Sequence, residues 1–172
     1  METSEHINKK VKSLLSSAGV NSAPIPIDKI VIENKISVQY AALDGDISGL
    51  LYKQGEKAVI GVNGLHASVR QRFTLAHEFG HFILGHKGDF FLDRVILFRS
   101  TKSKEANSVE ERDANAFAAA LLMPEEMVQE EILKEEYSEL DEEAVVGKLA
   151  RKFEVSTQAM AIRLQKLGLT TI

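Results

Sequence analysis

The sequence of 172 residues contains no cysteine. A disulfide framework and a thiolate metal site are therefore excluded, and any bound metal must be held by histidine, aspartate, glutamate or backbone oxygen atoms. No apolar run is long enough to span a bilayer. The N-terminal segment carries scattered charges where a signal peptide would have a continuous apolar stretch. These absences favour a protein that works in the cytoplasm and not in a membrane.

An excess of basic charge is also absent. The 21 basic and 25 acidic residues give a formal net charge of -4, so we expect no broad attraction to nucleic acid. The apolar fraction of 44% and the charged fraction of 27% are ordinary for a soluble globular protein. The length allows one hydrophobic core, and we expect a single domain over residues 1–172.

The hydrophobic pattern predicts an α+β fold. Residues 5–18 have the periodicity of a short amphipathic helix, and residues 36–62 are rich in β-branched and aliphatic residues. We predict a small antiparallel sheet over 36–62, with one more strand at 93–99. This sheet would pack on a buried helix and on a second helix over 110–123. The core of the domain would then span about residues 25–125.

The buried helix carries the sequence His77-Glu78-Phe79-Gly80-His81. Residues four apart lie on one face of a helix, so His77 and His81 can reach the same ion. Glu78 lies on the same turn and can accept a proton from the attacking water without being a ligand itself. Polar groups in an apolar run cost free energy unless they are paired or bound to metal. We therefore favour a metal site over a set of hydrogen-bonded core histidines.

A catalytic zinc ion usually has three protein ligands and one open position. The second apolar helix offers a carboxylate as the third ligand. Glu111 shares a helix face with the small or neutral residues Ala114 and Asn115, which would let the two helices approach closely. We rank Glu111 first, with Glu110 and Asp113 as alternatives. Asn115, one turn further on, could accept a hydrogen bond from a ligand imidazole.

Two residues flanking the motif are expected to act elsewhere. His86 follows His81 by five residues, which rotates it off the ligand face of the helix. We expect His86 to have a helix-end or surface role. Arg72 precedes the motif, and it fits either an ion pair with an acidic group near the site or a surface salt bridge.

The two motifs in combination resemble those of the ImmA/IrrE family of metallopeptidases. The resemblance rests on RQRFTLAHEFGHFILGH, followed about thirty residues later by ERDANAFAAALLMP. It implies a gluzincin-like site in which His77, His81 and a glutamate aligned with Glu111 bind Zn2+, with Glu78 catalytic. Many relatives have glutamate where this chain has Asp113.

The resemblance also implies a target. Characterised family members cleave helix-turn-helix transcriptional repressors and so derepress genes of mobile elements or stress responses. We expect a zinc-dependent endopeptidase whose substrate adds as a strand to the edge of the sheet, at residues 48–53 or 57–63. The alternative is a regulator, or a toxin–antitoxin or phage accessory protein, that binds repressor or DNA and has a structural or vestigial metal site. The intact Glu78 argues against that alternative, because a purely structural site needs no base.

The segment at about 142–169 has the hydrophobic spacing of a helix-turn-helix unit, with two helical patterns and a break between them. Its basic residues could meet DNA phosphates; they are Lys148, Arg151, Lys152, Arg163 and Lys166. Against this, Glu154 lies where such turns often have glycine, and the preceding stretch 125–143 is strongly acidic. We therefore favour packing or partner recognition over direct DNA binding. The sequence does not set the oligomeric state.

Overall fold

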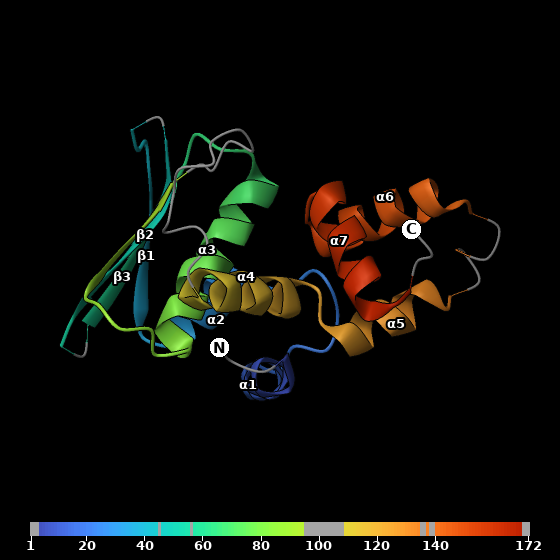
Figure 1. Ribbon diagram of the computed structural model, residues 1–172, viewed down its shortest axis with the longest axis horizontal. Coiled ribbons are helices and arrows are strands. Elements are labelled where there is room, and N and C mark those ends of the chain that lie inside the picture. Colours follow the sequence, from blue (N-terminus) through green and yellow to red (C-terminus); the bar gives the residue numbers. More distant parts are fainter. Residues whose placement is uncertain are drawn as a thin grey trace.

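The computed structural model describes residues 4–44, 46–55, 57–94, 109–134, 137 and 140–169. None of the helices within these ranges is long and apolar enough to cross a membrane. In chain order (Figure 1) the elements are α1 (Ser4–Ser17), α2 (Ile27–Glu33), β1 (Ile36–Ala41), β2 (Ile47–Gln54), β3 (Lys57–Asn63), α3 (Ser68–Ile83), β4 (Phe90–Arg94), α4 (Val109–Leu122), α5 (Glu125–Ile132), α6 (Glu142–Phe153) and α7 (Thr157–Leu167).

The α+β prediction is confirmed, and the sheet is mixed. The strand order is β1-β3-β2-β4, with β2 antiparallel to both β3 and β4. β1 runs parallel to β3, which differs from the expected all-antiparallel sheet. The reason is that β3 follows β2 in the chain, runs back antiparallel to it and lies between β2 and β1. Since β1 and β2 run in opposite directions, a strand antiparallel to β2 must be parallel to β1.

The topology corrects the expected substrate edge. Both candidate stretches, 48–53 in β2 and 57–63 in β3, are paired on both sides and have no free edge. The edge strands are β1 and β4. β4 begins at Phe90, three residues before the predicted strand at 93–99, and residues 95–99 lie outside the described part of the chain. A strand added near α3 would therefore meet β4.

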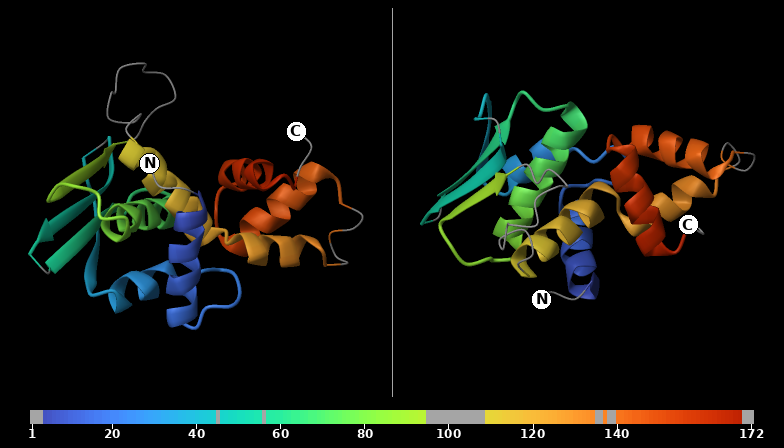
Figure 2. Two further views of the ribbon diagram at one scale, coloured as in Figure 1. Left: turned by 60° about the horizontal axis from the view of Figure 1, so that its bottom comes forward. Right: turned by 45° about the horizontal axis from the view of Figure 1, so that its top comes forward.

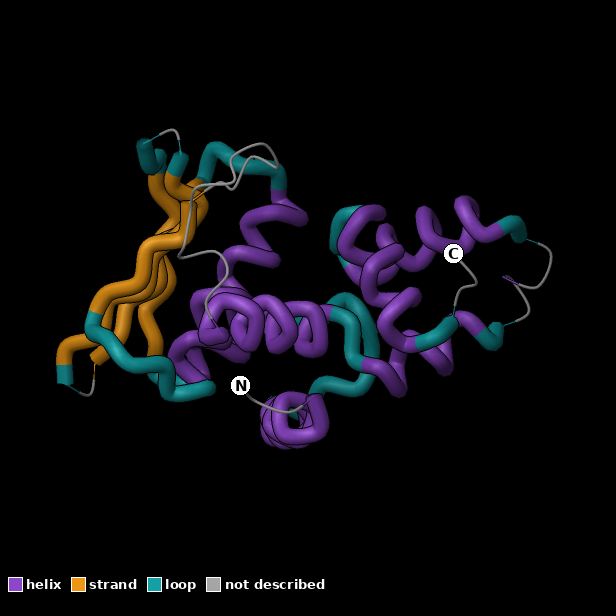
Figure 3. The backbone as a smooth tube through the Cα atoms, viewed as in Figure 1, coloured by secondary structure: helices purple, strands orange, loops and turns teal. Residues whose placement is uncertain are grey.

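All the described helices lie on one side of the sheet, as Figures 2 and 3 show. α3 packs against β2 and β3 and also against α4, so it lies at the centre of the fold. Phe79 of α3 and Phe117 of α4 meet edge to face with ring centroids 5.9 Å apart, and both are fully buried. This central position explains why every residue of α3 from Thr74 to His81 is buried.

Helices α5, α6 and α7 gather beyond the end of α4, away from the sheet (Figure 1). The predicted break lies between α6 and α7, where Glu154 adopts a left-handed conformation with φ 53°. The hydroxyl of Ser156 then accepts a hydrogen bond from the backbone N–H of Ala159 and caps α7. Glu154 thus takes the conformation that glycine would give this turn, and the helix-turn-helix-like connection is present.

The inner face of this helical segment is buried. Leu149, Phe153 and Leu164 have no measurable exposure. Arg163, which the sequence offered as a phosphate contact, is buried and donates from Nε to the carbonyl oxygen of Met123 at 2.9 Å. Arg163 therefore holds α7 against the end of α4 and is not available to DNA.

Candidate active site

Three predicted side chains come together between α3 and α4. The Nε2 atoms of His77 and His81 lie 3.1 Å apart. Glu111 places Oε2 3.3 Å from Nε2 of His77 and Oε1 3.2 Å from Nε2 of His81. One ligand atom from each residue lies within 4.8 Å of the others. Two imidazoles and one carboxylate that converge in this way fit the donor set of a catalytic divalent metal ion.

A glycine in the motif allows this convergence. A Cβ added to Gly80 would lie 3.0 Å from Cδ1 of Phe117 and 3.2 Å from the carbonyl oxygen of Ala114. Gly80 and Ala114 therefore let α3 and α4 approach closely, and Glu111 lies one turn before Ala114. The small residues of α4 were expected to serve this purpose, but the contribution of Gly80 was missed.

His77 and Glu111 shift each other's pKa. Burial alone would raise the pKa of Glu111, but hydrogen bonds from His77 and His81 outweigh it and hold the pKa well below its usual value. Burial likewise opposes the charged form of His77, yet the hydrogen bond to Glu111 and the nearby Glu78 raise its pKa overall. A charged carboxylate in contact with two imidazoles is also what a divalent cation needs there.

Glu78 lies beside this cluster and is 1% exposed. Neither of its carboxylate oxygens has a hydrogen-bond partner among the described residues. Burial raises the pKa of Glu78 to about 8, with further contributions from Asp93 and Glu111, while His77 opposes the shift. A Cβ added to Gly49 would approach Oε1 to 3.4 Å, so the backbone of β2 covers this carboxylate. An unpaired buried carboxylate costs free energy, so Glu78 is a candidate functional residue.

The far side of each imidazole ring also has a partner. Nδ1 of His77 lies 3.2 Å from Oδ1 of Asn115, the contact expected for that residue. Nδ1 of His81 lies 2.8 Å from Nδ1 of His86. The surface alternative for His86 is wrong, because its side chain is 8% exposed and contacts a cluster residue. The helical period did not apply, since α3 ends at Ile83 and the chain turns before His86.

The alternative third ligands do not join the cluster. Among the described residues, the group that could hold a metal ion consists of His77, His81 and Glu111. Glu110 accepts a hydrogen bond from the backbone N–H of Lys87 at 3.4 Å. Asp113 is buried on α4 outside the group. The rotation of α4 therefore directs Glu111 alone of the three toward the histidines.

Asp93 is a site residue that the sequence did not reveal. On β4 it pairs with Gly49 of β2, and cross-strand partners share a face of the sheet. Gly49 faces Thr74 and Glu78 of α3, so Asp93 faces the site. Burial raises the pKa of Asp93, Glu111 adds to this, and His77 opposes it. The alternation on β4 could have signalled Asp93 once the strand had been placed at Phe90–Arg94.

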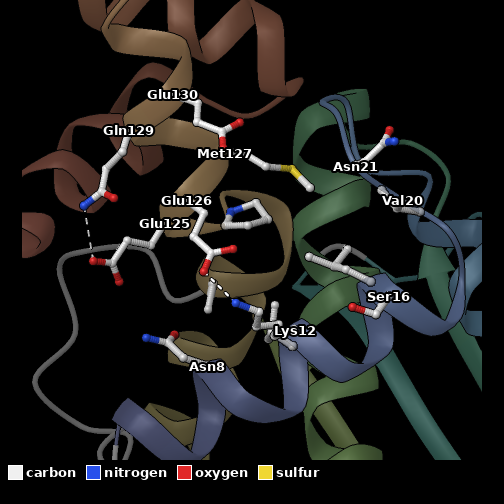
Figure 4. A pocket seen from close by; sticks show the side chains of 14 residues that line it. Asn8, Lys12, Ser16, Val20, Asn21, Glu125, Glu126, Met127, Gln129 and Glu130 are labelled. Carbon is white, nitrogen blue, oxygen red and sulfur yellow. Dashed lines mark hydrogen bonds and ion pairs between the residues drawn. The ribbon is translucent and has the colours of Figure 1, made fainter.

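A separate groove of about 600 Å³ lies between α1 and the junction of α4 with α5 (Figure 4). Lys12 and Glu126 meet across it at 2.7 Å, with both side chains largely exposed. An exposed ion pair of this kind contributes little to stability. No residue of the His77, His81 and Glu111 group lines the groove, so it is distinct from the candidate active site.

Comparison with known proteins places this arrangement in a family. A family model described as the IrrE N-terminal-like domain, peptidase family M78, matches residues 33–165, well over half of the chain. The chain belongs to this family. The match includes the histidines of α3, Glu111 of α4 and most of the α6–α7 segment.

Two individual proteins add detail. Over 75 residues the chain is 40% identical to the radiation response metalloprotease IrrE of Deinococcus radiodurans, an alignment that covers 44% of this chain and 22% of that protein. A Mycobacterium tuberculosis transcriptional regulator of known structure is 17% identical, with a TM-score of 0.59 over 94% of this chain and 46% of that chain. The second likeness is one of fold alone. The chain spans less than half of the length of either relative.

Proposed function

We propose that this chain is a zinc-dependent, gluzincin-like endopeptidase. The observation that carries the proposal is the convergence of His77, His81 and Glu111 beside the unpaired carboxylate of Glu78. Two histidines and one glutamate form a common protein ligand set of catalytic zinc, with one position left for water or substrate. Membership in a peptidase family supports the same reaction class.

The roles follow from the positions. His77, His81 and Glu111 would hold the ion, which when bound supplies Lewis acidity that polarises a peptide carbonyl and activates water. Glu78 would accept the proton of the attacking water and pass it to the leaving amine. Burial raises the pKa of Glu78 to about 8 in the metal-free chain, and a cation held by the neighbouring ligands would favour the charged carboxylate that acts as the base.

The substrate would bind along β4. β4 is an edge strand whose Phe91 and Asp93 face α3, and the ring of Phe91 lies 4.6 Å from that of His81. An extended peptide added to the outer edge of β4, which pairs with no other strand in the described part of the chain, would gain main-chain hydrogen bonds and bring its backbone beside the cluster.

We infer that the substrate is a helix-turn-helix transcriptional repressor, cleaved in the cytoplasm to derepress mobile-element or stress genes. This inference comes from the motif resemblance, and the relative named a radiation response metalloprotease supports a stress-linked role. The competing function is binding of repressor or DNA through α6 and α7. It is favoured by the turn at Glu154 and opposed by the burial of Arg163.

The decisive experiment uses Glu78→Gln, which keeps size and removes the base. Purified parent and variant, loaded with Zn2+, are incubated with helix-turn-helix repressors encoded beside the gene, and cleavage is followed by mass spectrometry. We expect roughly 10²–10⁴-fold slower cleavage by the variant, with Zn2+ affinity nearly unchanged. Glu110→Gln, a carboxylate outside the cluster, serves as the control and should cleave normally. If the parent cuts no repressor, or if Glu78→Gln cuts as fast as the parent, the proposed function is wrong.

A further inference from the structure

His81 is contacted at both ring nitrogens. Its Nε2 atom points into the cluster, 3.2 Å from Oε1 of Glu111 and 3.1 Å from Nε2 of His77. Its Nδ1 atom points the other way, to Nδ1 of His86 at 2.8 Å, and this pair is buried. The distance allows one hydrogen bond between the two rings and therefore one proton between the two Nδ1 atoms.

The position of that proton decides whether His81 can bind a metal ion. A neutral imidazole has one N–H and one lone pair. His81 offers its lone pair from Nε2 only if its proton is on Nδ1, and a buried N–H requires an acceptor. Among the described residues, Nδ1 of His81 contacts Nδ1 of His86. His86 can accept from His81 only if its own proton is on Nε2.

We propose that His86 is a positioning residue that fixes the tautomer and the ring orientation of His81 for metal binding. Asn115 has the corresponding place at Nδ1 of His77, so each candidate ligand imidazole has its own acceptor. Ligand histidines in metalloproteins usually donate their second N–H in this way, and loss of the acceptor typically lowers metal affinity 10–100-fold. The proposal rests on the metal site of the proposed function and is independent of which protein is cleaved.

The backbone of His86 is held in place by two hydrogen bonds. Its backbone N–H donates to the carbonyl oxygen of His81 at 3.1 Å, and its carbonyl oxygen accepts from Nζ of Lys53 at 2.9 Å. Nζ of Lys53 also lies 5.0 Å from the centre of the Phe91 ring, which packs on His81. These contacts hold the segment after α3 in position, and they place His86 next to His81.

The test compares two substitutions that both remove the imidazole. In His86→Asn, the amide oxygen can take the place of Nδ1 as an acceptor, whereas His86→Leu has similar bulk and no acceptor. Zn2+ affinity is measured by competition with a chromophoric chelator, with the parent first. We expect His86→Leu to bind Zn2+ 10–100-fold more weakly and His86→Asn to stay within a few-fold of the parent. His6→Leu, on the exposed face of α1, controls for simple loss of a histidine.

A second measurement does not depend on the variants folding. Long-range ¹H–¹⁵N spectra of the Zn2+-loaded parent report which ring nitrogen carries each proton. We expect the proton of His81 on Nδ1 and that of His86 on Nε2. A parent that binds Zn2+ while His86 carries its proton on Nδ1 would overturn the inference. Equal losses of affinity in the folded Asn and Leu variants, or no loss in Leu, would also overturn it, and the proposed function would stand. A parent that binds no Zn2+ would instead overturn the proposed function itself.

Discussion

Arg72 on α3 holds Glu154 in the turn between α6 and α7 by two contacts. Its Nη1 atom lies 3.3 Å from Oε2 of Glu154, and its Nε donates to the backbone carbonyl oxygen of the same residue at 3.2 Å. Nη2 of Arg72 also donates to the carbonyl oxygen of Ile25 at 2.8 Å. One guanidinium group therefore joins the motif helix, the segment before α2 and the C-terminal helices. Arg72 pairs with an acidic group of the C-terminal segment and not with one of the metal cluster.

Removal of Arg72 should cost more stability than removal of the Glu154 side chain. Arg72→Met leaves two carbonyl oxygens without this donor, and we expect a loss of about 1–3 kcal/mol in the free energy of unfolding. Glu154→Gly loses an ion pair worth less than about 1 kcal/mol but relieves a left-handed backbone that costs a non-glycine residue about 1 kcal/mol. We expect its net effect to be near zero. Urea unfolding measures both variants, and a larger loss in Glu154→Gly would show that the carboxylate dominates the contact.

Gly80→Ala should damage the metal site although alanine favours helix. The added methyl would press on Phe117 and on the backbone at Ala114, and move α4 with Glu111 away from the histidines. We expect Zn2+ affinity to fall by about tenfold or more, the order seen when ligand support is lost. Gly147→Ala is a matched control on α6, because its nearest contact would be Arg151 at 3.7 Å. The control should gain up to about 1 kcal/mol of stability and keep its affinity. Unchanged affinity in Gly80→Ala would contradict the role given to helix spacing.

Glu111→Gln tests whether Glu111, and not the neighbouring Glu110, is the third metal ligand. The amide is a poor ligand for zinc, so we expect affinity in a chelator competition to drop by at least tenfold. Glu110→Gln should have little effect, because Glu110 contacts the backbone of Lys87 and not the cluster. If Glu110→Gln were the more damaging change, α4 would have to be rotated in solution relative to the structure.

Glu78 should make the metal-free chain less stable as pH rises. Its pKa is about 8 in the folded chain against an ordinary value of 4.5. Below pH 4.5 the carboxyl is protonated in both the folded and the unfolded chain, so it does not lower the free energy of unfolding. Between 4.5 and 8 the unfolded chain releases the proton more readily, so folding loses stability, and the penalty is complete above 8.

The comparison with Glu78→Gln isolates this effect. The stability difference between the metal-free variant and the metal-free parent should shift in favour of the variant by on the order of 3–5 kcal/mol between pH 4 and pH 9. Chemical unfolding at several pH values measures it. A difference that does not vary with pH would mean that Glu78 is solvated in solution.

The sequence by itself determined the features that depend on local periodicity. Four-residue spacing puts His77 and His81 on one helix face, and Glu78 on the same turn, whatever the rest of the chain does. The break between α6 and α7 was likewise readable, because Ser156 can cap a helix wherever that helix packs. The α+β class followed from the change of hydrophobic period between the strand and helix segments.

Only the tertiary structure decided which groups meet the histidines from elsewhere in the chain. The sequence ranked Glu111 ahead of Glu110 and Asp113 but left all three open, and the packing of α4 on α3, which is close at Gly80 and Ala114, brings Glu111 to the cluster. His86 lies beyond the end of α3, where the helical period no longer fixes direction. The local sequence pattern also could not predict the strand order, because long-range packing, and not the pattern of a single strand, decides which strands pair.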